Sequence, residues 1–321
     1  MKIKKVKTFI QNNTIIPIII LVFIIASVFV PGFCNIANLF SIFNQNAMKG
    51  VMAIGMTFLI LTGYFDMSLC TTIGLSAALV CGMQRSMPVL WAVLIALLTG
   101  IVIGMINGAL VAYAGINAFV VTLAMMMGVR GIAYIYHEGN SMLAVSESFV
   151  HFGVGKIGLL SWISILFIIL LLLSYFILEF TPFGRKIYAT GGNVVAAYNA
   201  GINTRKVIFV NFIICGFGAA LGGVLYASVQ GASTPGLGWP DMHMLVIAAV
   251  VLGGTKLSGG IGNVWYTLGG VMLLGMIDSI MNLLNVQTYI STLVNGVIMI
   301  GVLCLDKIMM NKQLQKTNLS K

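Results

Sequence analysis

Long apolar stretches alternate with short polar interruptions along the whole chain. A membrane-spanning helix needs roughly 20 mostly apolar residues, with about 17 as the lower limit. Ten stretches reach or approach this length, at residues 14–31, 47–63, 68–84, 89–112, 117–136, 160–180, 206–229, 243–256, 263–284 and 287–306. The pattern predicts an all-α polytopic membrane protein with about ten transmembrane helices, or eight if the short third and eighth stretches do not cross.

The third and eighth stretches are rich in glycine as well as short. We expect them to be tilted, broken or re-entrant. Irregular backbone at membrane depth is tolerated where protein or a water-filled cavity surrounds it.

One polar interruption is much more polar than its surroundings. Residues 184–202 read GRKIYATGGNVVAAYNAGI, between two apolar stretches. Glycine pairs, asparagines and a short alanine-rich run predict a loop, a brief helix and a stop. We expect this segment, within a loop of about 181–206, to lie outside the membrane and to contact another molecule.

The composition agrees with a membrane protein and excludes several other classes. Hydrophobic residues make up 60% of 321 and charged residues 7%, with a mean hydropathy of +1.06. Soluble domains are about 25% charged, so we expect one transmembrane domain over 1–321. The net charge of +10 therefore does not indicate nucleic acid. The five cysteines lack the spacing of a disulfide framework or metal site.

The distribution of basic residues predicts the orientation. Four lysines precede the first apolar stretch, which we interpret as an uncleaved helix rather than a signal peptide. Four more basic residues flank the polar segment, Lys256 follows the eighth stretch, and four lysines lie in the C-terminal tail. The positive-inside rule places both termini and the loop 181–206 in the cytoplasm. The eight-helix alternative puts the loop on the same side.

Glycines recur at four-residue spacing in two of the apolar stretches. Gly100, Gly104 and Gly108 form one series, and Gly218 and Gly222 form another. Small residues at this spacing let helix backbones approach closely in lipid. We expect tight helix packing at both places.

The sequence contains no pattern typical of catalysis. A phosphate-binding G-x-x-x-x-G-K-[ST] motif is missing, since the one Gly-Lys step, Gly155–Lys156, is followed by isoleucine. We expect neither ATP hydrolysis nor a bound cofactor in this chain. His137 and His151 fall in the long outer loop, where solvated surface is the default interpretation.

A few polar side chains fall in or beside the apolar stretches. A charge at the bilayer centre costs roughly 2.5–3.5 kcal/mol, so such residues tend to face the bundle interior. Asp66 either satisfies a helix break or lines a transport path. Arg130 is expected in an ion pair or at the interface, and His243 opens the eighth stretch. Asp278 is the best candidate to face a cavity, and Trp239 is expected to anchor at the membrane surface.

Four motifs, in order along the chain, carry a resemblance to a known family. They are AIGMTFLILTGYFDMS (53–68), GMINGALVAYAGINAFVVTL (104–123), FGRKIYATGGNVVAAYNAGIN (183–203) and IAAVVLGGTKLSGGIG (247–262). Together they resemble the permeases of monosaccharide ABC importers, the ribose, xylose, galactose and autoinducer-2 group. The resemblance extends from about residue 47 to 306.

The resemblance implies a fold and a set of partners. It implies a type II importer-like helix bundle in the bacterial plasma membrane, paired with a second, identical or different permease subunit. A cytosolic ATPase would consume the ATP, and an extracytoplasmic binding protein would deliver the sugar. The loop would couple to the ATPase through Gly191, Gly192, Asn193, Ala196, Ala197 and Gly201. Polar candidates for the translocation path are Asp66, Asn107, Asn117, Thr122 and Asp278.

This chain departs from the family pattern in three places. Tyr64 and Phe65 replace a Gly-Ile pair, His243 and Leu245 replace an acidic pair, and Asp278 begins a segment that is often Asn-Asn-Gly. If these positions line the path, we expect a solute other than ribose or a non-identical partner subunit.

Two other functions remain open on the sequence. A secondary transporter would need ion-coupling residues near the midplane, and no chain of acidic residues suited to a proton relay is evident. A membrane scaffold without transport activity is disfavoured by the intramembrane polar residues.

Overall fold

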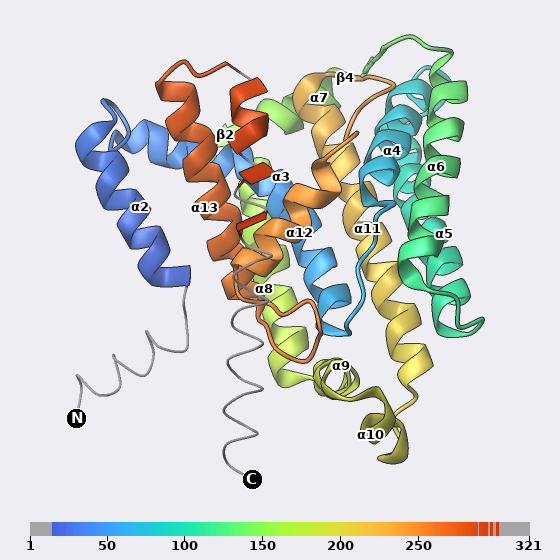
Figure 1. Cartoon of the computed structure of the whole chain (residues 1–321). Helices are drawn as coiled ribbons and strands as arrows, with labels where there is room; N and C mark the ends of the chain where they lie inside the picture. Colours follow the sequence, from blue (N-terminus) through green and yellow to red (C-terminus); the bar gives the residue numbers. More distant parts are fainter. Residues whose placement is uncertain (1–14, 288, 295, 298–299, 302–321) are drawn as a thin grey trace, which may run out of the picture.

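The computed structural model describes residues 15–287, 289–294, 296–297 and 300–301 and shows a bundle of helices (Figure 1). Nearly all described secondary structure is helical. The helices of the bundle are α2 (Ile15–Phe29), α3 (Ile36–Leu61), α4 (Leu69–Met83), α5 (Val89–Ala112), α6 (Ala118–His137), α8 (Trp162–Phe180), α11 (Thr204–Gln230), α12 (Met242–Leu252) and α13 (Val264–Leu283).

These helices confirm the predicted all-α polytopic membrane fold. Among the described residues, α5, α6, α8, α11 and α13 are each long and apolar enough to cross a membrane. Helices α2, α4 and α12 are shorter apolar helices. Each of the first nine predicted stretches coincides with a helix of the bundle, and the tenth, 287–306, lies partly outside the described residues.

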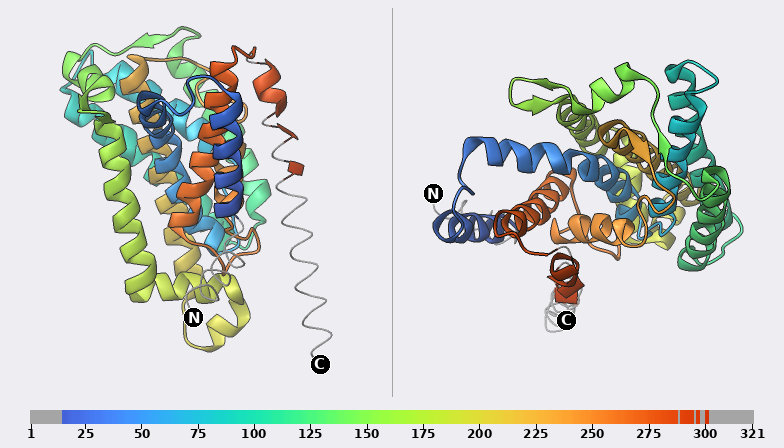
Figure 2. Two further views of the ribbon diagram at one scale, coloured as in Figure 1. Left: turned by 90° about the vertical axis from the view of Figure 1, so that its left-hand side faces the viewer. Right: turned by 90° about the horizontal axis from the view of Figure 1, so that it is seen from above.

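Helix α3 corrects one predicted boundary. It begins at Ile36 rather than at 47, because the Asn35 side chain accepts a hydrogen bond from the backbone amide of Ala37 and starts the helix. The polar run 44–46 lowers the hydropathy but does not interrupt the helix. Figures 1 and 2 show the first part of α3 lying across one end of the bundle before the helix turns down into it.

Helix α11 lies at the centre and contacts α3, α4 and α5. Its glycines meet those of α5: a Cβ atom added at Gly100 would overlap the carbonyl oxygen of Gly216, and one added at Gly104 would overlap that of Phe212. The predicted close packing is confirmed for the series on α5, and the α11 glycine that meets it is Gly216. The predicted α11 series, Gly218 and Gly222, instead packs against Gly55 and Met52 of α3. Backbones can approach this closely only where both helices lack bulky side chains.

Helices α4 and α12 are too short to cross a bilayer. Their 15 and 11 residues span roughly 22 and 16 Å at about 1.5 Å per residue, whereas the hydrocarbon core is about 30 Å thick. Irregular segments precede them, 62–68 before α4 and 234–241 before α12. Because a Cβ atom at Gly238 would overlap the carbonyl oxygen of Cys70, the second segment packs against the start of α4.

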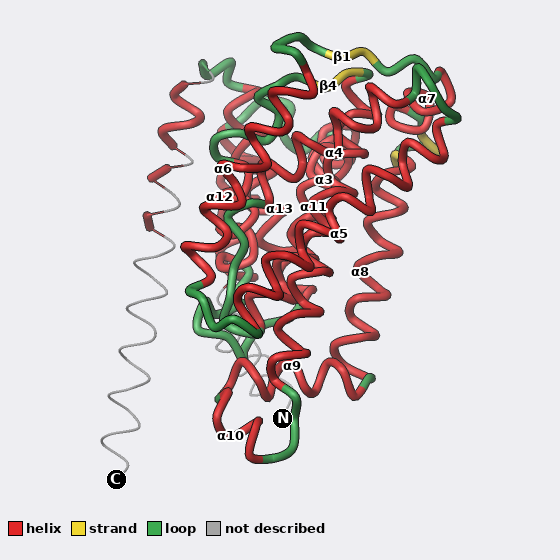
Figure 3. Tube along the Cα trace, turned by 90° about the vertical axis from the view of Figure 1, so that its right-hand side faces the viewer, coloured by secondary structure: helices red, strands yellow, loops and turns green. Residues whose placement is uncertain are grey.

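The short elements gather at the two ends of the bundle (Figure 3). At one end, the α7 end, lie α7 (Glu147–Val154), the antiparallel pair of β1 (Met142–Leu143) with β4 (Ala232–Ser233), and the hairpin of β2 (Lys156–Ile157) with β3 (Leu160–Ser161). The opposite end, the α10 end, carries α9 (Pro182–Gly192) and α10 (Val194–Asn199).

The segment at the α10 end is more helical than the sequence predicted. Residues 182–192 form a helix where we expected a loop. Thr181 caps this helix by accepting a hydrogen bond from the amide of Gly184, and Pro182 occupies its first turn. Proline is favoured there because its missing N–H would have no helical partner.

His137 is also corrected. It is 1% exposed rather than solvated. Its Nδ1 lies 2.8 Å from the carbonyl oxygen of Ala133, and its Nε2 lies 3.0 Å from the hydroxyl of Ser233. The β4 strand thus contacts the last residue of α6 through Ser233.

Candidate functional site

The α10 end presents a projecting tip formed by α10 and its flanking turns (Figure 1). Asn193 caps α10 through a hydrogen bond from the amide of Ala196, and Gly201 follows its end with φ of +82°. Val195 and Tyr198 are each 69% exposed on this short helix. Large apolar side chains projecting from the end of a bundle are typical of a surface that another protein covers.

The structure divides the predicted coupling residues into two groups. Exposed positions on the tip are Gly192, Asn193, Ala196 and Gly201. Ala197 is buried at 4% exposure and Gly191 is packed against the bundle. The sequence interpretation named small residues for a groove and missed the exposed Val195 and Tyr198. The i, i+3 spacing of these two apolar residues in a polar segment was the available signal.

A cluster of glycine backbones joins the tip to the bundle, and we call it the glycine junction. It comprises Gly63 after α3, Gly191 at the end of α9, and Gly259 and Gly260 between α12 and α13. A Cβ atom on Gly191 would overlap the carbonyl oxygen of Leu61, and one on Gly259 would lie 2.7 Å from the amide nitrogen of Gly63. Two loops and the end of α9 therefore touch backbone to backbone.

Hydrogen bonds hold the glycine junction together. The amide of Gly260 donates to the carbonyl oxygen of Leu61 at 2.9 Å, and the Tyr188 hydroxyl of α9 donates to the carbonyl oxygen of Gly262 at 2.9 Å. Burial raises the pKa of Tyr188 to about 12, so its phenol keeps the donated proton at neutral pH. Helix α9 is thereby bound to the loop between α12 and α13.

Segment 62–68 leads from the glycine junction to a buried polar cluster at the start of α4. Asp66 is 1% exposed, and its carboxylate accepts hydrogen bonds from the amide of Ser68 at 2.8 Å and its hydroxyl at 2.6 Å. The Asn107 amide of α5 donates to the Ser68 hydroxyl at 3.0 Å and to Asp66 at 3.3 Å. A carboxylate at a helix N-terminus is favourable, so the geometry supports the helix-break interpretation of Asp66.

Asn117 and Thr122, at the start of α6, make local hydrogen bonds instead. Asn117 is exposed and caps α6 by accepting a hydrogen bond from the amide of Phe119. Thr122 is buried and donates to the carbonyl oxygen of Ala118 at 2.8 Å. The structure thus joins Asp66 and Asn107 by hydrogen bonds, whereas the side chains of Asn117 and Thr122 bond to the backbone of α6.

A cavity of about 680 Å³ opens among α3, α7, α8, α11 and α13, and we call it the polar chamber. Ligand sites are typically about 300–1,000 Å³, so a monosaccharide fits this space. Much of its wall is polar. The polar residues that matter below are Ser41, Gln45, Lys49, Lys156, Asp278 and Asn282.

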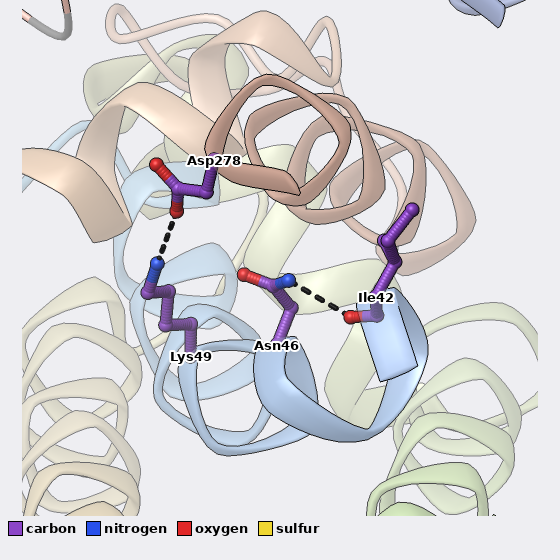
Figure 4. A network of polar contacts seen from close by, with 4 residues as sticks. All are labelled: Ile42, Asn46, Lys49 and Asp278. Carbon is purple, nitrogen blue, oxygen red and sulfur yellow. Dashed lines mark hydrogen bonds and ion pairs between the residues drawn. The ribbon is translucent and has the colours of Figure 1, made fainter. Parts of the chain in front are cut away.

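An ion pair crosses the polar chamber between two helices (Figure 4). The Lys49 ammonium of α3 lies 2.8 Å from the carboxylate Oδ2 of Asp278 on α13, and the side chains are 26% and 30% exposed. Beside them, Asn46 donates to the carbonyl oxygen of Ile42 at 2.8 Å. Sequence reasoning named Asp278 but not its partner Lys49. A lone lysine and a lone aspartate in apolar stretches were the signal that they pair.

Arg130 and His243 have surroundings that the sequence did not predict. The Arg130 guanidinium lies 4.0 Å from the centroid of the Trp239 ring and 5.4 Å from that of Tyr134, a cation–π arrangement. Of the two expectations for Arg130, the cation–π contacts take the place of the ion pair, and the position at the membrane interface stays a prediction. His243 is buried, and neither of its ring nitrogens has a hydrogen-bond partner within the described part of the chain.

A many-helix membrane bundle with two short helices preceded by irregular segments, a polar chamber and a projecting tip is typical of a transport permease. A family model described as "branched-chain amino acid transport system / permease component" matches residues 38–303. The chain therefore belongs to this permease family and is a multi-pass protein of the bacterial plasma membrane.

Curated relatives cover nearly the whole chain. The ribose import permease of Escherichia coli K12 is 34% identical over 302 residues, covering 92% of this chain and 93% of the relative. The ribose import permease of Bacillus subtilis is 36% identical over 288 residues, with 88% and 89% covered. The L-arabinose transport system permease of E. coli K12 is 33% identical over 301 residues, with 89% and 87% covered. No solved structure matches.

Proposed function

We propose that this chain is the permease subunit of an ATP-driven importer for a monosaccharide. A separate cytosolic ATPase holds the α9–α10 tip and hydrolyses the ATP. An extracytoplasmic binding protein delivers the sugar at the α7 end, and a second permease subunit, identical or not, completes the pathway. The observation that carries this proposal is the exposed apolar tip, joined to the helix bundle by the glycine junction.

The geometry supports a mechanism in which movement enters at the tip. Closure of the ATPase would displace α10 and α9 as a unit. Since Gly191 touches Leu61 and Gly260, α9 cannot move without displacing the loops after α3 and α12. Rigid-body transmission of this kind alternates a bundle between outward- and inward-facing states.

The charge distribution supports a cytoplasmic α10 end and cytoplasmic termini. Basic residues of the described part cluster there: Arg185, Lys186, Arg205, Lys206 and Lys256. The positive-inside rule places this end in the cytoplasm. A cytosolic ATPase can reach the tip only in this orientation.

A paired substitution tests the docking role. Val195→Asp with Tyr198→Asp places two charges on the apolar tip, and we expect ATPase co-purification to weaken at least about tenfold, since buried interface anchors contribute roughly 2 kcal/mol or more each. Leu143→Asp is the matched control, because Leu143 is 63% exposed on β1 at the opposite end. Undiminished co-purification of the paired variant would reject the docking role.

Sidedness is tested by labelling single cysteines in a background without the native cysteines. An impermeant maleimide on intact cells should label a cysteine at position 143 and leave one at position 198 unlabelled. Labelling of position 198 from outside would invert the orientation and exclude the proposed ATPase contact.

A further inference from the structure

The polar chamber contains a donor and an acceptor of opposite charge side by side, and neither is fully enclosed. We propose that Lys49 and Asp278 form a recognition site for an uncharged, polyhydroxylated solute, an aldose, during its passage through the bundle. This inference rests on the proposed function and adds to it the residues that contact the sugar.

The chemistry of neighbouring hydroxyl groups fits this pair. A hydroxyl donates one hydrogen bond and accepts two, so one hydroxyl of a diol can donate to Asp278 while its neighbour accepts from Lys49. The 2.8 Å between Nζ and Oδ2 matches the spacing of hydrogen-bonded oxygens. Both contacts would be charge-assisted, and such bonds are roughly twice as strong as neutral ones.

Each member of the pair keeps bonding capacity beyond the ion pair. Lys49 has three N–H donors, and Figure 4 shows one carboxylate oxygen of Asp278 on Lys49 and the other pointing away. Their exposure of 26% and 30% is toward the chamber that they line. The solute therefore does not need to break the ion pair in order to bind.

The helices that carry the pair are held at a fixed distance. The Asn46 side chain fills the space where a Cβ atom at Gly275 would lie, and Ser279 of α13 donates to Asn38 of α3 at 3.1 Å. A site supported on rigid helices holds its donors in place before the ligand arrives.

The charges of the wall favour an uncharged solute. The lining contains two lysines, Lys49 and Lys156, and one carboxylate, Asp278, so its net positive charge disfavours a cation. The carboxylate disfavours an anion at the pair itself. Amide and hydroxyl groups such as those of Gln45 and Asn282 supply further neutral partners. A zwitterionic amino acid also carries both charges, and it is the competing ligand in the test below.

Saturation-transfer NMR on the purified full-length chain in lipid nanodiscs tests this site without the binding protein. D-ribose, L-arabinose, D-allose and L-leucine serve as probes at millimolar concentration. We expect transfer to at least one aldose and none to L-leucine. Lys49→Gln and Asp278→Asn should each weaken aldose binding about tenfold or more, as expected for loss of a hydrogen bond to a charged group, and Arg85→Gln on the exposed α4–α5 turn should not.

The exchanged pair Lys49→Asp with Asp278→Lys distinguishes a role in sugar recognition from a role that only links α3 to α13. It restores an ion pair but reverses donor and acceptor, so we expect a changed order of preference among the three aldoses. The inference would be overturned if the exchanged pair bound the three aldoses with the affinities and the order of preference of the unchanged protein, or if both single variants bound them unchanged. It would equally be overturned if no aldose gave a signal, or if L-leucine gave stronger transfer than the aldoses. Co-purification of the ATPase is read in parallel and reports on the proposed function separately.

Discussion

The glycine junction and the polar chamber differ in what lies between their segments. At the junction, backbone touches backbone at Gly63, Gly191, Gly259 and Gly260, and side chains are almost absent. In the chamber, long polar side chains surround about 680 Å³ of open space. In the proposed mechanism, the first arrangement transmits displacement because backbone meets backbone with no side chain between the parts. The second can adapt to a passing solute because its side chains have room.

The difference also concerns what a substitution can do at each place. A methyl group added at the junction would overlap neighbouring backbone atoms. A changed polar group at the end of a chamber side chain would still have open space around it. We therefore expect the junction to be sensitive to size and the chamber to be sensitive to charge and hydrogen bonding.

Gly191→Ala should have the largest effect. Its Cβ atom would overlap the Leu61 carbonyl oxygen, and relief of such overpacking costs about 1–3 kcal/mol. Because α9 must shift to make room, we expect sugar uptake to fall more than about tenfold, at 1.4 kcal/mol per factor of ten, while the ATPase still co-purifies. Gly131→Ala is the control, since a Cβ atom there meets nothing within 4 Å. Normal uptake by Gly191→Ala would show that the junction does not transmit movement.

Tyr188→Phe should have an intermediate effect. It removes the hydroxyl that donates to Gly262 and keeps the ring. The loss of a typical intramolecular hydrogen bond costs about 0.5–1.5 kcal/mol, measured as a lower unfolding temperature in detergent. We expect uptake to fall less than in Gly191→Ala, because the glycine contacts remain. An unchanged unfolding temperature would show that this bond does not hold α9 to the bundle.

Lys49→Gln should have the smallest effect on stability. The pair is partly exposed, and exposed ion pairs contribute about 0–1 kcal/mol. Its unfolding temperature should therefore fall less than that of Tyr188→Phe, even though its sugar binding weakens. A larger loss of stability than at Tyr188 would mean that the chamber, too, is mainly a structural contact.

Hydropathy predicted most of the bundle because lipid requires long apolar helices, and this requirement is visible in the sequence. It left open whether α4 and α12 cross, because their stretches are short and rich in glycine. The start of α3 was missed because residues 44–46 are polar yet remain helical. Helix α9 was missed because its glycine pair at 191–192 ends the helix rather than opening a loop.

The site was less predictable because it depends on contacts between distant segments. Asp66 and Asn107 were both named from the sequence, but their meeting required α4 and α5 to be adjacent. Lys49 and Asp278 pair across a sequence separation of 229 residues. The glycine junction was invisible for the same reason, since each of its glycines taken alone resembles an ordinary turn residue. The transport roles of Asp66, Asn107, Asn117, Thr122 and Asp278 remain predictions.

Site-specific photo-crosslinking in intact cells tests most directly whether the α9–α10 tip contacts the cytosolic ATPase. A photoreactive phenylalanine replaces Tyr198 on α10, and Leu143 on β1 provides the comparison position. We predict that position 198 crosslinks to the cytosolic ATPase and that position 143 does not. A crosslink from 198 to an extracytoplasmic protein, or to the ATPase from 143 instead, would contradict the account.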